Sequence, residues 1–241
     1  MNTYIRIGDN RTFALKQAVL LYQDGTRCFA TLHEVKHRPN QAPYLTAGQS
    51  VTTGFLETLA KGLGASMAAE VLPEHVLART PDLIAWWCRA RQRLMFFGAG
   101  NAETSALNGK MFPHPALVFM IQGRELFVRA LAENRRPTAD TRLCNAPYWN
   151  TDEHGRVCLG SMRVPDETGV ASLEDWESAY FASEFTHPSG AVRLTTHPGG
   201  FLGLWSLLAR RKGAFPVRFL AESTQTLQDF VRGARASSQI D

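Results

Sequence analysis

The sequence has no apolar run of the roughly 18 to 20 residues that a membrane-spanning helix requires. Its first residues, Met-Asn-Thr-Tyr-Ile-Arg-Ile-Gly, also lack the apolar core that is typical of a signal peptide. We therefore expect a cytoplasmic protein with no membrane partner.

Cysteine is scarce, with only Cys28, Cys88, Cys144 and Cys158 in the chain. No two of them form a Cys-x-x-Cys pair, and no Cys/His spacing matches a zinc site. The sequence thus indicates neither a disulfide framework nor a structural metal. We expect reduced thiols and no metal ligands.

The sequence motifs of several large enzyme classes are missing: GxxxxGK[ST], GxGxxG, GxSxG and HExxH. Their absence removes the common nucleotide-binding proteins, serine hydrolases and zinc proteases, and we expect no cofactor. The formal net charge is +4 and the pI is about 9.0, but the basic residues are scattered along the chain. The sequence therefore does not favour nucleic acid as a partner.

A chain of 241 residues can bury a full hydrophobic core, and one domain with an added subdomain is the simplest interpretation. Residues 17–36 predict a β-hairpin that turns at Asp24-Gly25, a pair that suits a type I′ turn. Residues 37–50, rich in Pro, Asn, Gln and Gly, predict a connector. We thus expect an N-terminal hairpin extension (1–50), a main domain (51–232) and a disordered tail (233–241).

The main domain is predicted to mix helices and strands. A helix capped by Thr52 or Thr53 is expected to run through Met67, because its apolar residues share one face. Apolar runs separated by turns predict an antiparallel meander with strands in residues 75–79, 82–88, 93–97, 116–121 and 125–131, and a polar loop over residues 98–115. Helical patterns follow at residues 172–185, 201–209 and 224–231. The fold class is therefore α+β.

One stretch, residues 145–160, has a composition suited to chemistry. Cys158 follows a loop, Asn-Thr-Asp-Glu-His-Gly, whose residues favour tight turns and exposure, so its thiol is a candidate nucleophile. Asn150, eight residues earlier, is placed to offer its side-chain N–H to an oxyanion that forms when Cys158 attacks a carbonyl. The alternative for Cys158 is an ordinary buried cysteine, and this structural interpretation is the one we give Cys28, Cys88 and Cys144.

Two further residues of the same loop, Asp152 and His154, are candidates for moving a proton to or from an attacking amine, since histidine titrates near neutrality. The alternative is that both are solvated loop residues. The sequence leaves the two interpretations open.

The stretch resembles the active-site pattern of ubiquitin-conjugating (E2) enzymes, which is His-Pro-Asn, a short polar loop and Gly-x-Ile/Val-Cys-Leu. Here Asn150 and Cys158 have the same spacing, and Gly155-Arg-Val-Cys-Leu159 matches the second half, whereas Tyr148-Trp149 replaces the His-Pro. Over most of residues 15–220 the chain is similar to the prokaryotic E2-like family known as PRTRC system protein B, through the segments Val76-Leu-Ala-Arg79, Trp86-Trp87, Met95-Phe-Phe97, Arg136-Pro137, Ala146-Pro-Tyr-Trp-Asn150 and Gly155-Arg-Val-Cys-Leu-Gly160.

This resemblance implies an E2-like fold, an antiparallel meander flanked by helices, to which the N-terminal hairpin is added. It also implies a conjugation system on plasmids or mobile elements, with a ThiF-related E1-like adenylating protein, a ubiquitin-like protein and a JAB-type metallopeptidase as partners. Cys158 would carry the ubiquitin-like protein as a thioester, and Asn150 would stabilise the oxyanion during transfer to an amine. ATP would be used by the E1-like partner.

The rival hypothesis is an inert E2-shaped adaptor that binds protein partners or nucleic acid in a plasmid-borne system. The altered His-Pro-Asn motif, the basic charge balance and the added N-terminal segment favour it. An exposed Cys158 with a low pKa would favour the enzyme instead, because the thiolate is the reactive form.

Overall fold

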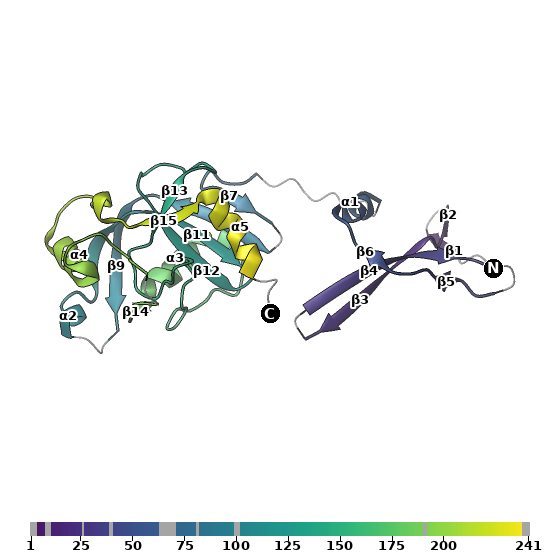
Figure 1. Ribbon diagram of the computed structural model, residues 1–241, viewed down its shortest axis with the longest axis horizontal. Helices are drawn as coiled ribbons and strands as arrows, with labels where there is room; N and C mark the ends of the chain where they lie inside the picture. Colours follow the sequence, from purple (N-terminus) through teal and green to yellow (C-terminus); the bar gives the residue numbers. More distant parts are fainter. Residues whose placement is uncertain are drawn as a thin grey trace. The chain divides into compact units, whose positions relative to one another are not determined.

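The computed structural model describes residues 4–7, 11–25, 27–38, 41–62, 71–80, 82–98, 102–189 and 192–237 (Figure 1). The chain divides into two compact units, residues 1–70 and 71–241. The predicted limit between residues 50 and 51 therefore falls inside the first unit.

The first unit is built on the predicted hairpin. Strand β3 (Gln17–Asp24) pairs antiparallel with β4 (Arg27–Lys36), which confirms the hairpin. The predicted turn was one residue too early, because Asp24 still pairs with Arg27, and Gly25, at a φ of 54°, follows this last pair. Two short strands, β5 (Tyr44–Leu45) and β6 (Gln49–Ser50), pair with β4 inside the predicted connector.

A second strand pair and one helix complete the described part of this unit. Strands β1 (Tyr4–Ile7) and β2 (Arg11–Ala14) form an antiparallel pair that the sequence analysis did not predict. Helix α1 spans Thr53–Gly62, and the Oγ1 of Thr52 caps it by accepting the N–H of Phe55 at 3.2 Å. The predicted continuation of this helix to Met67 lies outside the described residues.

The second unit is organised around a six-stranded antiparallel sheet with the order β15-β13-β12-β11-β8-β7. Its strands are β7 (Val76–Arg79), β8 (Leu83–Cys88), β11 (Ala116–Gln122), β12 (Glu125–Leu131), β13 (Arg142–Asn145) and β15 (Glu222–Thr226). The predicted α+β class, with its antiparallel strands, is thus confirmed.

The predicted order of the meander is wrong at one place. Strand β9 (Arg91–Phe97) does not lie between β8 and β11, which pair directly with each other. It leaves the main sheet and pairs with β10 (Lys110–His114) and with β14 (Glu184–Phe185). β10 lies in the predicted polar loop, where the short run Met111 to His114 is too weak an alternating pattern to identify a strand.

Helices cover both faces of the main sheet. Alternate strand residues such as Trp86 and Phe119 pack on one face with α3 (Leu173–Ala182) and α4 (Gly200–Arg210). The other face, which includes Trp87 and Phe127, packs against α5 (Leu227–Ser237). Because a strand points successive side chains to opposite faces, two adjacent tryptophans enter two different cores.

The described residues of the second unit also include three short helical segments: α2 (Ala102–Ser105), η1 (Val170–Ser172) and η2 (Val217–Phe219). The predicted helix over residues 172–185 ends at Ala182, where the chain turns into β14. The predicted amphipathic segment 224–231 is split between β15 and α5. Helix α5 extends into the predicted disordered tail as far as Ser237, and residues 238–241 lie outside the described part of the chain.

Candidate active site

Cys158 is exposed, and it follows a residue that anchors the chain to the sheet. Val157 is buried, and its N–H donates to the carbonyl oxygen of Leu126 in β12 at 2.8 Å. The N–H of Cys158 donates to the carbonyl oxygen of Asn150 at 2.8 Å, which closes the loop between them. The thiol lines a depression of about 400 Å³ together with Glu125, Asp152, Arg156, Val157, Leu159 and Ser189. Cys158 is therefore held on a fixed backbone and open to a partner.

The carboxylate of Asp152 organises the loop before the cysteine. One of its oxygens, Oδ1, accepts the N–H groups of His154 and Arg156, both at 2.9 Å. Its carbonyl oxygen accepts the N–H of Gly155 at 3.0 Å, and its own N–H donates to the carbonyl oxygen of Arg156 at 3.0 Å. These contacts give Asp152 a turn-forming role.

His154 is largely exposed to solvent. Its side chain is 74 % exposed, and its Nε2 lies 3.8 Å from a carboxylate oxygen of Glu153. It does not line the depression at Cys158. The structure therefore brings Asp152, but not His154, to the surface that surrounds the thiol.

Asn150 adopts a φ of 61°, a left-handed conformation that asparagine tolerates better than most residues. Its side chain is buried and bonds the segment that follows α3: Nδ2 donates to the carbonyl oxygen of Glu184 at 2.7 Å. Its Oδ1 accepts the N–H and the hydroxyl of Thr186, both at 3.1 Å. The side-chain amide of Asn150 is thus engaged with residues 184–186 through both its nitrogen and its oxygen.

Arg129, which the sequence analysis did not identify as a site residue, is hydrogen-bonded to the loop. Arg129 is 1 % exposed, although it lies in the apolar strand β12. Its guanidinium donates to the carbonyl oxygen of Glu153 at 2.6 Å, to Oδ1 of Asn145 at 2.6 Å and to Oε1 of Gln225 at 2.7 Å. Burial lowers the pKa of Arg129 to about 10, so the side chain remains charged at neutral pH. A lone arginine inside an apolar run was the available signal.

Aromatic packing holds the segment before Asn150. Tyr148 is fully buried, and its hydroxyl bonds Nδ1 of His114 at 2.8 Å. Trp149 stacks on Phe201 of α4 with ring centroids 4.3 Å apart. The indole N–H of Trp205, also in α4, donates to the carbonyl oxygen of Pro147 at 3.1 Å. Tyr148 and Trp149, which replace the His-Pro of the E2 motif, therefore fix this segment to α4.

The braced loop and its cysteine lie within a region that matches a known protein family. The family model for prokaryotic E2 family D matches residues 55–223, which include Asn150, the loop and Cys158. This match spans well over half of the chain.

The chain belongs to prokaryotic E2 family D.

No curated protein and no solved structure matches the chain. The family match begins within α1 and ends within β15, so it includes the whole main sheet except the end of that edge strand.

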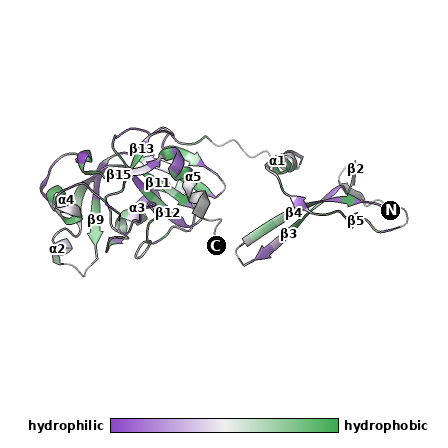
Figure 2. Cartoon of the chain, viewed as in Figure 1, coloured by the Kyte–Doolittle hydropathy of each residue, from purple (hydrophilic) through white to green (hydrophobic). Residues whose placement is uncertain are grey.

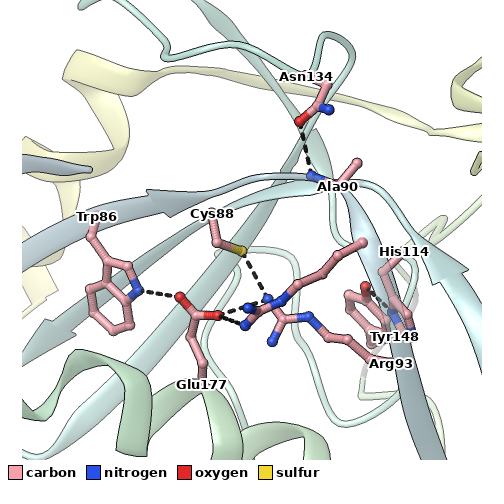
Figure 3. A network of polar contacts seen from close by, with 9 residues as sticks. Trp86, Cys88, Ala90, Arg93, His114, Asn134, Tyr148 and Glu177 are labelled. Carbon is pink, nitrogen blue, oxygen red and sulfur yellow. Dashed lines mark hydrogen bonds and ion pairs between the residues drawn. The ribbon is translucent and has the colours of Figure 1, made fainter. Parts of the chain in front are cut away.

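This E2-like domain also contains a partly buried charge cluster on the α3 face of the sheet (Figure 3). Glu177 of α3 is 6 % exposed, and its Oε2 accepts from Arg91 at 2.6 Å and from Arg93 at 2.7 Å. Its Oε1 accepts the indole N–H of Trp86 at 3.0 Å. Arg93 also donates to the sulfur of Cys88 at 3.2 Å. The cluster ties α3 to β8 and β9.

Neither of the two less exposed cysteines resembles Cys158. Burial raises the pKa of Cys88 to about 12, and the nearby carboxylate of Glu177 adds to this effect. Burial likewise raises the pKa of Cys144, assisted by Glu222. Both thiols therefore stay protonated near neutral pH and are poor nucleophiles.

Neither a metal cluster nor a membrane helix occurs among the described residues. No group of three or more His, Cys, Asp or Glu side chains in that part of the chain could hold a metal ion. None of the helices within the same residues is long and apolar enough to cross a membrane.

Proposed function

We propose that this prokaryotic E2 family D protein carries a ubiquitin-like protein as a thioester on Cys158. The observation that carries the proposal is an exposed cysteine in a depression, on a braced loop inside the family-matched region. Of the four cysteines, Cys28 is also exposed, but it precedes the matched residues. We propose further that the protein is a member of the PRTRC system protein B family and that it acts in the cytoplasm.

The proposed reaction has two transfers. The Cys158 thiolate attacks the thioester carbonyl between the ubiquitin-like protein and the cysteine of the ThiF-related E1-like partner, whose thiolate leaves. An amine then attacks the new thioester, loses a proton and releases the Cys158 thiolate. ATP is consumed by the E1-like partner, and a JAB-type metallopeptidase would reverse the conjugation.

Asn150 has two roles in this proposal. Its bonds to residues 184–186 hold the backbone carbonyl that receives the Cys158 N–H. Its second amide hydrogen would stabilise the oxyanion when the amine attacks, and losing such a donor costs about 10²- to 10³-fold in rate. Asp152 and His154 remain proposed proton carriers, with Asp152 the better placed.

The direct test mixes the protein with ATP and the E1-like and ubiquitin-like proteins encoded beside it. With the unchanged chain we expect an adduct that a reducing agent cleaves. Cys158→Ser should give either an ester that the reducing agent does not cleave or no adduct. Cys28→Ser should give the same reducible adduct as the unchanged chain. Cys28→Ser is the matched control because that thiol is also exposed. No adduct, from partners shown to be active on each other, would favour the inert adaptor, as would steeply salt-dependent nucleic-acid binding.

The role of Asn150 is tested after loading. Asn150→Ala is expected to load Cys158 but to discharge it to an amine about 10²-fold more slowly. An unchanged rate of discharge would show that Asn150 does not stabilise the oxyanion. If the variant fails to load and also has a lower unfolding free energy, only the structural role of Asn150 would remain.

A further inference from the structure

We propose that two copies of this chain associate through β3, by antiparallel pairing of this strand with itself around a two-fold axis at Leu20. This association involves only the first unit and does not depend on the chemistry at Cys158.

β3 is an edge strand in the part of the chain that the structure describes. It is at one end of its sheet and pairs there with β4, while β5 and β6 pair with the far side of β4. The carbonyl oxygen of Lys16, just before β3, accepts the N–H of Val35 at 2.8 Å. Because backbone groups alternate in direction along an antiparallel strand, even-numbered residues face β4. The N–H and C=O groups of Val19 and Leu21 therefore face the open edge.

The open edge lacks the features that normally prevent edge pairing. From Gln17 to Gln23 it has neither a charged residue nor a proline. Its apolar side chains are exposed, by 72 % at Leu21, 49 % at Tyr22 and 40 % at Val19. Figure 2 shows the apolar stretches of this hairpin and the polar end of β3. A bare strand of this kind favours pairing with another strand.

The charges at the two ends of β3 favour a second copy of this chain as the partner of the open edge, and they define the register of the pairing. Lys16 and Asp24 lie four residues before and four residues after Leu20. Pairing centred on Leu20 places Lys16 of each copy opposite Asp24 of the other, and Val19 opposite Leu21. Opposed residues then share a face of the joined sheet, as antiparallel pairing requires. Centring on Val19 or Leu21 instead would lose both charge pairs.

The joined sheet is small, because only one strand from each copy forms the contact. The surface area buried by two paired strands is below that of a standard stable interface, so we expect the association to be reversible and concentration-dependent.

The test is sedimentation velocity of the full chain over a concentration series. We expect a monomer–dimer equilibrium that Leu21→Lys weakens at least about tenfold, because two lysines enter the centre of the contact. Phe29→Lys is the matched control: Phe29 is 60 % exposed but lies on β4, away from the open edge. A monomer at every concentration, or equal weakening by both variants, would overturn the proposal.

A charge exchange tests the register. Lys16→Asp should weaken the dimer several-fold at low salt, since it sets an aspartate of one copy against Asp24 of the other, and should do so less at high salt. The exchange Lys16→Asp with Asp24→Lys should restore most of the affinity, because the opposite charges meet again. Circular dichroism establishes that each variant keeps the hairpin. Failure of the folded double variant to regain affinity would contradict pairing centred on Leu20.

Discussion

At the scale of single residues, the loop that carries Cys158 depends on a glycine. Gly155 has a φ of 84°, which side chains rarely adopt. A Cβ there would lie 2.8 Å from the carbonyl oxygen of Val128 and 3.1 Å from Nε of Arg129. Any larger residue must therefore move a strand backbone or the buried guanidinium. The Gly155 position of the motif is required by packing as well as by conformation.

We predict that Gly155→Ala lowers the free energy of unfolding by about 2 to 4 kcal/mol, because backbone strain and a clash add. Gly123→Ala is the matched control: its φ of 57° gives similar strain, but nothing lies within 4 Å of its Cβ. The control should lose about 1 kcal/mol. Urea unfolding measures both, and equal losses would show that the contact with β12 is unimportant.

His114 gives a second prediction at this scale. Burial lowers its pKa from the ordinary 6.5 to about 3, and its Nδ1 shares a hydrogen bond of 2.8 Å with the hydroxyl of Tyr148. Between these two pKa values the unfolded chain binds more protons than the folded chain. The stability due to neutral His114 is thus complete above pH 6.5 and is lost as the pH falls toward 3. His114→Asn keeps an acceptor and removes the titration, so its stability should decline less with acid. Parallel profiles in urea unfolding would contradict this.

At the scale of secondary-structure elements, the attachment of α3 to β8 and β9 depends on Glu177. Its carboxylate meets two arginines of unequal burial, since the side chain of Arg93 is 9 % exposed and that of Arg91 is 56 % exposed. Solvent screens the interaction with Arg91 more strongly. The buried pair is therefore the one that positions the helix.

Glu177→Gln is predicted to lower the unfolding free energy by about 3 kcal/mol, because it leaves Arg93 buried without a charge partner. A double-mutant cycle should give a larger coupling with Arg93→Met than with Arg91→Met. The opposite order would mean that the exposed pair holds the helix.

At the scale of the whole molecule, both hydrophobic cores that include the sheet lie in the second unit. Every buried residue of these cores lies between Val76 and Phe230. We predict that a fragment of residues 71–241 folds cooperatively and, with active partners, loads Cys158 as the full chain does. Matching circular dichroism and denaturant midpoints would support this. A fragment without cooperative unfolding would show that residues 1–70 are part of the domain.

The sequence by itself determined the α+β class, the hairpin of residues 17–36 and the segment that contains Cys158. These features depend on neighbours in the chain: alternation, turn residues and the spacing of Asn150 and Cys158 are local patterns. Alternation also places Trp86 and Trp87 on two faces, although it does not say what covers each face.

Only the tertiary structure decided what those residues touch. It diverted β9 from the main sheet, directed the Asn150 side chain toward residues 184–186 and assigned Asp152 to the turn. It also brought Arg129 into contact with the loop at Glu153. It joined Glu177 to Arg93, which lies 84 residues earlier in the chain. Contacts between distant segments depend on burial and on which polar groups remain to be satisfied, and no local pattern contains that information.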